Sequence, residues 1–220
     1  MQSCKIGMLE SLPMNADRID KEGYRANVGI ILSNRECKLL LAGRVGSKGW
    51  QFPQGGMLEG ESAEEAMYRE LHEEIGLTAD DVEVLGWTDD WLRYRLPNRF
   101  VRKHSLPLCI GQKQRWFMLR LLGPDDRVSV DHSASPEFDR WRWVEFWRPV
   151  NEVIYFKRRV YARALHELGP HIYPEGLPPR PRWWPKRWRV VFDKDLKRAE
   201  RGRNAAASEG LDDCQADNPQ

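Results

Sequence analysis

The sequence predicts an α/β fold, in which strands form a sheet that helices cover. The first observation is a succession of short apolar runs separated by polar turns, which is the pattern of strands. The second is a segment of good helix formers, residues 63–75, which lies between those runs and has a start and a stop signal. The third is a hydrophobic fraction of 41% in 220 residues, enough for the core of one domain.

Strands are expected before and after the helical segment. Residues 27–33 and 38–42 are apolar runs on either side of a short polar turn, so they are expected to form a hairpin. A glycine-containing stretch, residues 50–56, follows them and is expected to form a loop. Further strands are expected at residues 82–87, 91–96, 115–121 and 141–145.

The helical segment carries its own boundary signals. Ser62 is a suitable N-cap, and Glu65 lies three residues further on, which is the capping-box pattern. Gly76 supplies a C-terminal stop. The residues that can form its apolar side are Ala66, Met67, Leu71 and Ile75. A second, single helix is expected from residue 149 or 150 to residue 168.

The composition excludes several classes of protein. The net charge is only +2, so the chain as a whole is no polycation. No window approaches the roughly 20 apolar residues of a membrane span, and the N-terminus lacks the basic-then-apolar order of a secretory signal. The four cysteines form no CxxC pair, which argues against a disulfide framework or a zinc site and favours a reducing, cytoplasmic setting.

Three segments are expected along the chain. Residues 1–18 form an N-terminal extension without clear periodicity, residues 19–168 form the folded domain, and residues 169–220 form a tail. The tail is first rich in Pro, Arg and Trp and then has a composition typical of disorder. Its tryptophans are interleaved with positive charges, which suits single-stranded RNA. Packing onto the domain and contact with a partner protein are the alternatives.

Three glutamates of the first helix carry the functional hypothesis. Glu70 and Glu74 are one helical turn apart, and Glu73 lies beside them. Because carboxylates this close repel each other, a cation is expected among them, and oxygen ligands favour Mg²⁺ or Mn²⁺ over zinc. Such an ion would neutralise a polyphosphate and make a bound water more acidic. The alternative is an ordinary solvated helix face.

Fixed spacing around these residues argues against that alternative. Within 23 residues, five residues separate Gly55 from Glu61 and seven separate Glu61 from Arg69-Glu70, which Glu73-Glu74 and Gly76 follow. This spacing resembles the signature of the Nudix hydrolases. The resemblance implies an α/β/α sandwich around a central mixed β-sheet, a glutamate helix that binds the metals, and hydrolysis of a phosphoanhydride bond.

The flanking sequence resembles one branch of that family over residues 19–168, namely the bacterial RNA 5′-pyrophosphohydrolases, which include enzymes described as dinucleoside polyphosphate hydrolases. The segments that carry this resemblance are residues 23–29, 50–56, 64–70, 109–114, 136–139 and 156–158. The chain departs from the branch at Gly49, where a small hydroxyl residue is usual, and at residues 57–59. These differences bear on substrate preference and leave the metal chemistry untouched.

The resemblance also implies roles for individual residues. Glu70 and Glu74 become the principal metal ligands, and Glu73 becomes a further ligand or the residue that orients the attacking water. Gly55 offers its backbone carbonyl, and Glu137 resembles the family's remote carboxylate. Arg69 and Glu61 support the ligands. The residues implied in RNA binding are Arg25, Arg44, Tyr94, Ile154, Phe156 and Lys157. Without the resemblance, Glu137 reads as a surface acid and Phe156 as a core residue.

The expected function is therefore conversion of the 5′-triphosphate or diphosphate end of RNA to a 5′-monophosphate, which initiates mRNA decay. One alternative is hydrolysis of free dinucleoside tetraphosphates, and another is an inactive RNA-binding module. The expected partners are Mg²⁺ or Mn²⁺, the RNA 5′ end and a protein activator of the kind that some relatives use, with neither membrane nor DNA. A further hypothesis places the translation start at Met14, because members of the family begin close to the Gly23-Tyr24-Arg25 motif.

Overall fold

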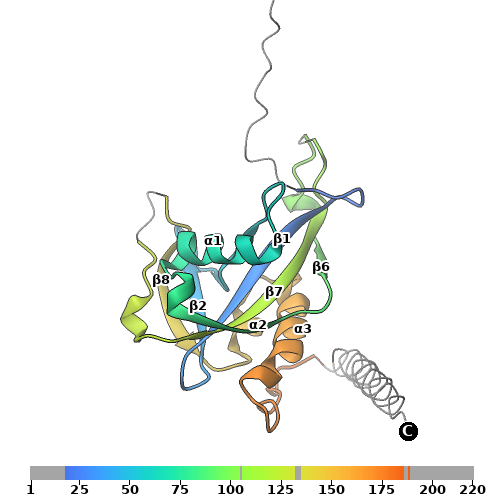
Figure 1. The fold of residues 1–220 in the computed structure, drawn as a ribbon. Helices are drawn as coiled ribbons and strands as arrows, with labels where there is room; N and C mark the ends of the chain where they lie inside the picture. The colour runs from blue at the N-terminus through green and yellow to red at the C-terminus, as the bar shows by residue number, and fades with distance from the viewer. Residues whose placement is uncertain (1–17, 105, 132–134, 186–187, 189–220) are drawn as a thin grey trace, which may run out of the picture. The chain divides into compact units, whose positions relative to one another are not determined.

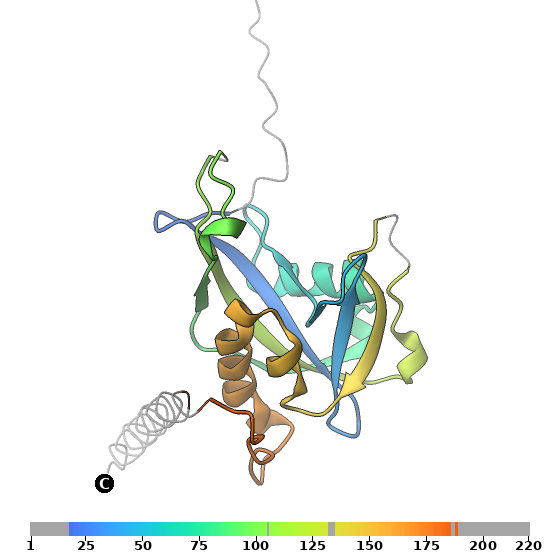
Figure 2. The same cartoon turned by 180° about the vertical axis from the view of Figure 1, so that it is seen from behind.

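The computed structural model of the chain describes residues 18–104, 106–131, 135–185 and 188. A mixed β-sheet forms the centre, with α1 (Ala63–Ile75) on one face and α2 (Arg148–Glu152) and α3 (Arg158–Leu168) on the other (Figures 1 and 2). The predicted α/β class and three-layer arrangement are confirmed. The strands are β1 (Tyr24–Ser33), β2 (Leu39–Arg44), β3 (Trp50–Gln51), β4 (Gln54–Gly56), β5 (Val82–Trp87), β6 (Leu92–Arg95), β7 (Gly111–Leu121) and β8 (Phe138–Val144).

The sheet has the order β3-β2-β1-β7-β5, with β4 on β1, β6 on β7 and β8 on β2. β1 and β7 pair in parallel from Tyr24↔Gly111 to Ser33↔Arg120, and the other pairs are antiparallel. β1 meets β2 only at Ser33↔Leu39, whereas its middle pairs with β4. This branching brings the backbone of Gly55 and Gly56 into the sheet, directly beside β1.

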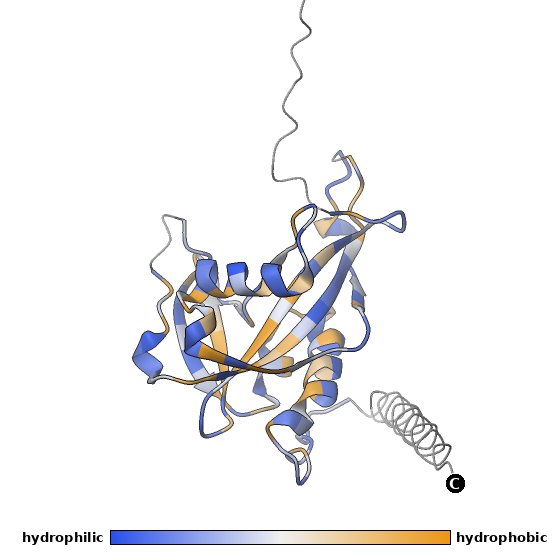
Figure 3. Cartoon of the chain, in the orientation of Figure 1, coloured by the Kyte–Doolittle hydropathy of each residue, from blue (hydrophilic) through white to orange (hydrophobic). Residues whose placement is uncertain are grey.

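The alternation of side chains along β1 builds a separate core on each face. Ala26, Val28 and Ile30 are buried with the apolar side of α1, and hydrophobic residues concentrate along the central strands (Figure 3). On the other face, Trp116 of β7 packs edge-on against Tyr161 of α3, with ring centroids 5.0 Å apart. Both helices are therefore anchored to the same pair of central strands.

The predicted boundaries of α1 are confirmed. Ser62 Oγ accepts a hydrogen bond from Glu65 N (3.2 Å), and Glu65 Oε2 accepts one from Ser62 N (2.8 Å), which completes the capping box. Gly76 ends the helix with φ +72°, a left-handed conformation that glycine adopts without strain. The predicted apolar side is buried in full.

The expected single helix over residues 149–168 is wrong. α2 ends at Glu152, the backbone extends at Val153 and Ile154, and a short 3₁₀ turn, η4 (Tyr155–Lys157), leads into α3. Val153 is buried at the break, and Arg158 donates to its carbonyl and to that of Asn151 (2.9 Å). Burial of Val153 and these bonds from Arg158 compensate for the lost helical hydrogen bonds.

The strands also differ from expectation in extent. β1 begins three residues before the expected run, β7 begins four residues earlier, and β8 spans Phe138–Val144. The stretch expected as a loop, residues 50–56, contains the short strands β3 and β4. Polar residues at the starts of β1 and β7 hid their strand character, because the ladder between these two strands supplies the hydrogen bonds that the sequence pattern does not reveal.

Several sequence expectations fall outside the described residues. These are the hypothesis on Met14, most of the extension 1–18, and the disordered end of the tail. The chain divides into a unit that ends at Pro178 and a second unit from Pro179. In the second unit, the ring of Trp184 lies 5.8 Å from that of Trp183 and 5.6 Å from that of Trp188. No helix in the described ranges has the length and apolar character needed to cross a membrane.

Asp81 supports a pH-dependent prediction at η1 (Ala79–Asp81). Its carboxylate accepts hydrogen bonds from Thr78 N (2.9 Å) and Thr78 Oγ1 (2.8 Å), and these bonds hold the pKa of Asp81 below its usual value. We expect Asp81→Ala to lower the free energy of unfolding by about 1 kcal/mol at pH 7. Because the pKa in the folded protein is depressed, this stabilisation is present above the unfolded-state pKa of about 3.9 and is lost as pH falls through the folded pKa.

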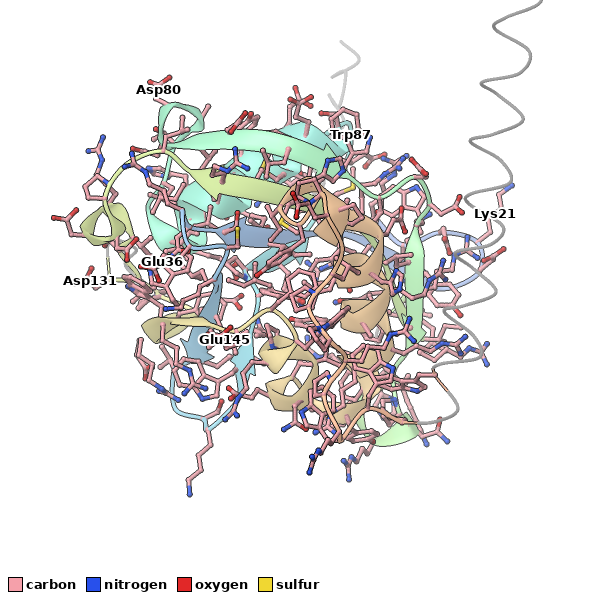
Figure 4. The ribbon with its side chains drawn as sticks, turned by 90° about the horizontal axis from the view of Figure 1, so that it is seen from below. Lys21, Glu36, Asp80, Trp87, Asp131 and Glu145 are labelled. Carbon is pink, nitrogen blue, oxygen red and sulfur yellow. The ribbon has the colours of Figure 1, made fainter. Side chains whose placement is uncertain are left out.

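Urea unfolding at pH 7 and at successively lower pH tests this expectation. The difference between wild type and Asp81→Ala should shrink as the pH falls. Asp80→Ala is the matched control, because Asp80 projects outward from the same turn (Figure 4). A difference that stays constant down to the lowest pH at which the protein folds would show that the carboxylate charge of Asp81 is irrelevant.

Candidate active site at the glutamate helix

The glutamates of α1 differ in how they are exposed. Glu70 and Glu74 are 8% and 6% exposed and face the β4 strand, as their spacing of one turn predicts. Glu73, on the outer side, has a side chain that is 55% exposed. Of these three glutamates, two therefore have buried carboxylates and one has a solvent-accessible carboxylate.

Glu74 has one satisfied and one unsatisfied carboxylate oxygen. Its Oε2 accepts a hydrogen bond from Gln54 N (2.7 Å), which links α1 to β4. Its Oε1 is buried and has no hydrogen-bond partner. Burial, followed by the negative charges of Glu70 and Glu137, raises the pKa of Glu74 well above its usual value. A buried oxygen of this kind is costly without a partner, and a bound cation is one partner that would compensate it.

Gly55 lies directly against the carboxylate of Glu70. A Cβ atom added at Gly55 would stand 1.8 Å from Glu70 Cδ, so no side chain fits there. A Cβ on Gly56 would stand 2.2 Å from Arg25 Nη2. Because these two positions carry no side chain, the β4 backbone lies against the carboxylate of Glu70 at Gly55 and against the guanidinium of Arg25 at Gly56. Both charged groups therefore meet the same strand.

Arg69 connects the acidic residues around it. It donates to both carboxylate oxygens of Glu61 (2.7 and 3.0 Å), to Glu70 (2.7 Å) and to Glu73 (3.1 Å). It also donates to the Gly56 carbonyl (2.8 Å). The hydrogen bonds from Arg69 keep the pKa of Glu61 below its usual value. Arg69 therefore holds Glu61 and Glu70 in place through hydrogen bonds.

The residues present fit a divalent cation by their chemistry. Glu70, Glu74 and the Gly55 carbonyl supply hard oxygen ligands on adjacent elements, and Glu74 Oε1 lacks another partner. In the described part of the chain, no three acidic, His or Cys side chains already converge on one point. Arg69 instead supplies the positive charge that holds Glu70 and Glu73.

Glu137 comes to this site from a distant part of the sequence. It is exposed and precedes β8, where its carbonyl accepts a hydrogen bond from Val45 N (3.0 Å). Its charge raises the pKa of both Glu70 and Glu74, after the larger effect of burial. The structure therefore brings the remote carboxylate within electrostatic reach of the glutamate helix.

Lys157 faces the same carboxylates from the other helix layer. Burial first, and then the charge of Arg44, lower its pKa to about 8, while Glu74 and Glu137 oppose this shift. Its Nζ lies 5.8 Å from the centroid of the Tyr94 ring. The break between α2 and α3 thus places a cation beside the acidic cluster, with Arg44 close to it.

Of the other residues implied in RNA binding, Ile154 and Phe156 are near Lys157 in the chain, whereas Tyr94 and Arg25 come from β6 and β1. The ring of Phe156 lies 5.7 Å from that of Tyr94, and Ile154 is exposed at the helix break. Tyr94 itself is buried, and its hydroxyl donates to Gln112. Tyr94 therefore supports the ring of Phe156 and offers little surface of its own. Arg25 lies over Gly56, beside the glutamate helix.

Tyr161 is a site-supporting residue that the sequence did not reveal. It is fully buried in α3, and its hydroxyl accepts a hydrogen bond from Phe52 N (3.1 Å). The residue after Pro53, Gln54, donates its N–H to Glu74. A three-residue segment is thus bonded to α3 at one end and to α1 at the other. A tyrosine in a helical apolar pattern carries no signal for this role.

We expect Tyr161→Phe to lower the free energy of unfolding by about 1–3 kcal/mol, because the buried Phe52 N–H would lose its acceptor. We also expect a loss of catalytic activity, since Gly55 and Glu74 depend on the position of this segment. Denaturant unfolding and turnover measure the two effects. Tyr68→Phe, on α1, is the control and should change stability by less than about 0.5 kcal/mol. Equal stability of the two variants would contradict the assignment.

The chain is similar in sequence to a known family and to several known proteins. Residues 23–168 match the family model of the NUDIX domain. The RNA pyrophosphohydrolase of Alkalilimnicola ehrlichii is 58% identical over 163 residues, which are 74% of this chain and 90% of that protein. The RNA pyrophosphohydrolase of Thioalkalivibrio sulfidiphilus is 60% identical over 160 residues, which are 73% of this chain and 92% of that protein.

Solved structures agree in fold. A C. elegans Ap4A hydrolase in a binary complex superposes with a TM-score of 0.51 at 19% identity, covering 68% of this chain and 98% of that one. The E. coli dihydroneopterin triphosphate pyrophosphohydrolase gives a TM-score of 0.51 at 17% identity, covering 63% and 92%. At this identity the likeness concerns the fold alone.

Proposed function

Because the chain belongs to the Nudix hydrolase family, whose members use divalent metal cations, we propose that it removes pyrophosphate, or phosphate in two steps, from the 5′ end of RNA. The chain is a pyrophosphohydrolase, and its curated relatives at 58% and 60% identity carry the name RNA pyrophosphohydrolase. The product would be an RNA with a 5′-monophosphate, which initiates mRNA decay.

The observation that supports this substrate is that two chemically different groups of residues lie near each other. One group consists of Glu70 and Glu74, and the other of Lys157 with Phe156 beside it. Ammonium and guanidinium groups attract the phosphates, and the ring of Phe156 offers a stacking surface for an unpaired base. A free triphosphate would use only the cations, whereas a triphosphate attached to RNA would use both.

The chain's residues divide the work between binding and positioning. Lys157 and Arg44 attract the triphosphate, and Arg25 adds a cation beside β4. Glu70, Glu74 and the Gly55 carbonyl would hold the cation, which we propose to be Mg²⁺, with Glu137 contributing charge from the position just before β8. When bound, such an ion neutralises phosphate charge and makes a water more acidic. The exposed Glu73 orients the attacking water, and Arg69 keeps Glu61 and Glu70 in place.

Positioning and electrostatic attraction supply most of the rate in this proposal. Charge that develops on the leaving phosphate is met by groups that are already fixed in the fold, so little reorganisation is needed during the reaction. We place the enzyme in the cytoplasm, where its RNA substrate is found. A reducing compartment also suits its four cysteines, none of which forms a CxxC pair. A protein activator stays a prediction without an assigned surface.

The test is an assay with 5′-end-labelled triphosphate RNA, with and without Mg²⁺. We expect label to be released as pyrophosphate or phosphate only when the metal is present. A parallel reaction with a free dinucleoside tetraphosphate provides the comparison. Hydrolysis of the dinucleotide at a higher kcat/KM than the RNA would replace the proposed substrate, and binding of RNA without any release would indicate an inactive module.

A further inference from the structure

β6 and the segment that joins it to β7 have an unusual charge. Residues 92–111 contain five Lys or Arg and no Asp or Glu. Within it, a surface pocket with a volume of about 680 Å³ is lined by Asn98, Arg99, Val101, Arg102, Lys103 and His104. We call residues 98–104 the cationic loop. Its residues were not implied in substrate binding by the sequence, and the reaction site described above does not use them.

A row of aromatic rings connects the cationic loop to the proposed site. Phe100, which is 41% exposed, lies with its ring centroid 5.4 Å from that of Phe156. Tyr155, which is 53% exposed, lies 5.4 Å from Phe156 on another side. The central ring of the row, Phe156, directly precedes Lys157 of the proposed site, and Phe100 at one end belongs to the cationic loop. Large rings exposed at both ends of such a row are available for stacking.

Arg99 completes this surface. Its guanidinium carbon lies 4.9 Å from the centroid of the Phe100 ring and 5.8 Å from that of Tyr155. A cation held between two exposed rings offers a phosphate contact and a stacking face at one place. Alternating aromatic faces and positive charges are the features with which proteins bind single-stranded nucleic acid.

We propose that the cationic loop and Tyr155 bind the RNA strand downstream of its reacting 5′ end. Arg99, Arg102 and Lys103 contact backbone phosphates, and Phe100 and Tyr155 stack with unpaired bases. The inference rests on the proposed function, because it extends the same substrate beyond the residues around Phe156. It makes the length and single-stranded character of the RNA, and not only its triphosphate, part of what the enzyme recognises.

Substrate length tests this inference. The substrates are a dinucleotide with a 5′-triphosphate and a triphosphate RNA of about 12 nucleotides, within the usual span of a single-strand binding surface. For the double variant Arg99→Ala/Lys103→Ala we expect KM to rise about tenfold for the longer RNA and to stay unchanged for the dinucleotide, with kcat unaltered. Loss of two phosphate contacts should also reduce the salt dependence of log(kcat/KM) by a slope of about 1.4.

A second variant separates stacking from charge. Tyr155→Ala should raise KM for the longer RNA about fivefold or more, through the loss of one stacked base. Its salt dependence should match that of the wild type, because no positive charge is removed. For the longer RNA, the loss of phosphate contacts therefore changes the salt dependence of kcat/KM, whereas the loss of a stacking ring does not.

Arg35→Ala is the matched control for charge. Arg35 lies in the turn after β1, whereas the cationic loop lies beyond the other end of that strand. Figure 4 shows Glu36, next to Arg35, and Lys21, near the start of β1, on opposite sides of the molecule. Arg35→Ala should leave the kinetics of both substrates unchanged.

The outcomes distinguish this inference from the proposed function. A wild-type enzyme that hydrolyses neither RNA would refute the proposed function. If the wild type hydrolyses both, equal effects of Arg99→Ala/Lys103→Ala and of Tyr155→Ala on long and short substrates would overturn the inference alone. Unchanged kinetics in both of these variants would also overturn it and would reassign the surface to a different partner.

Discussion

Glu74→Gln is expected to lower kcat for triphosphate RNA by about 10³-fold, equivalent to about 4 kcal/mol of transition-state stabilisation. The same change is expected to stabilise the protein in the absence of metal. Both effects have one cause, since Glu74 Oε1 is buried without a hydrogen-bond partner. The glutamine can keep the bond from Gln54 N through its amide oxygen, while it removes a buried carboxylate whose negative charge a bound cation would balance.

Turnover and thermal unfolding, each with and without Mg²⁺, measure these effects. Wild type should gain stability when Mg²⁺ is added, and Glu74→Gln should gain little. Glu64→Gln is the control, because Glu64 is exposed on the same helix. A variant that keeps full turnover would remove Glu74 from the reaction. A variant that loses turnover because it unfolds would show that the carboxylate serves the fold.

Gly55→Ala is expected to lower kcat/KM by about 10²-fold, the loss that a displacement of about 1 Å in a reacting group can cause. The added Cβ would stand 1.8 Å from Glu70 Cδ, so either the carboxylate or β4 must move. The contact is with the end of a side chain that Arg69 already holds at 2.7 Å, which makes rotation of Glu70 costly. We expect the free energy of unfolding to fall by about 1–3 kcal/mol through this overpacking.

Gly123→Ala is the matched control for this substitution. A Cβ at Gly123 would meet Arg127 Cγ at 3.3 Å, a flexible side chain on the surface, and no group of the active site. Kinetics and denaturant unfolding of the two variants should therefore differ clearly. Wild-type activity in Gly55→Ala would mean that the approach of β4 to Glu70 is unimportant for the reaction.

Local signals in the sequence were sufficient for the first helix and for most strands. Ser62, Glu65 and Gly76 set the ends of α1 through bonds made within a few residues. The predicted limits of this helix therefore agree with the observed ones. The break at Val153 had no such signal, because neither Gly nor Pro marks it. Burial of Val153 and the hydrogen bonds from Arg158 decide it, and both depend on residues brought together by the fold.

The candidate site divides in the same way. Glu70 and Glu74 follow from helical spacing, and the structure confirms that they share a buried face. Glu137 and Lys157 lie far from α1 in sequence, so only the resemblance to a family indicated them. Tyr161 and the cationic loop gave no signal of function, since a buried tyrosine and a basic surface segment are both common. Their significance comes from what they contact.

The segment Phe52–Gln54 has a mechanical consequence. One of its amides is bonded to Tyr161 and another to Glu74, so two helices on opposite faces of the sheet are clamped to the same short strap. A displacement of α3 that keeps both hydrogen bonds would also move the side chain of Glu74. We therefore expect docking of a long molecule against the Phe156 side to be transmitted, through these three residues, to the carboxylate of Glu74.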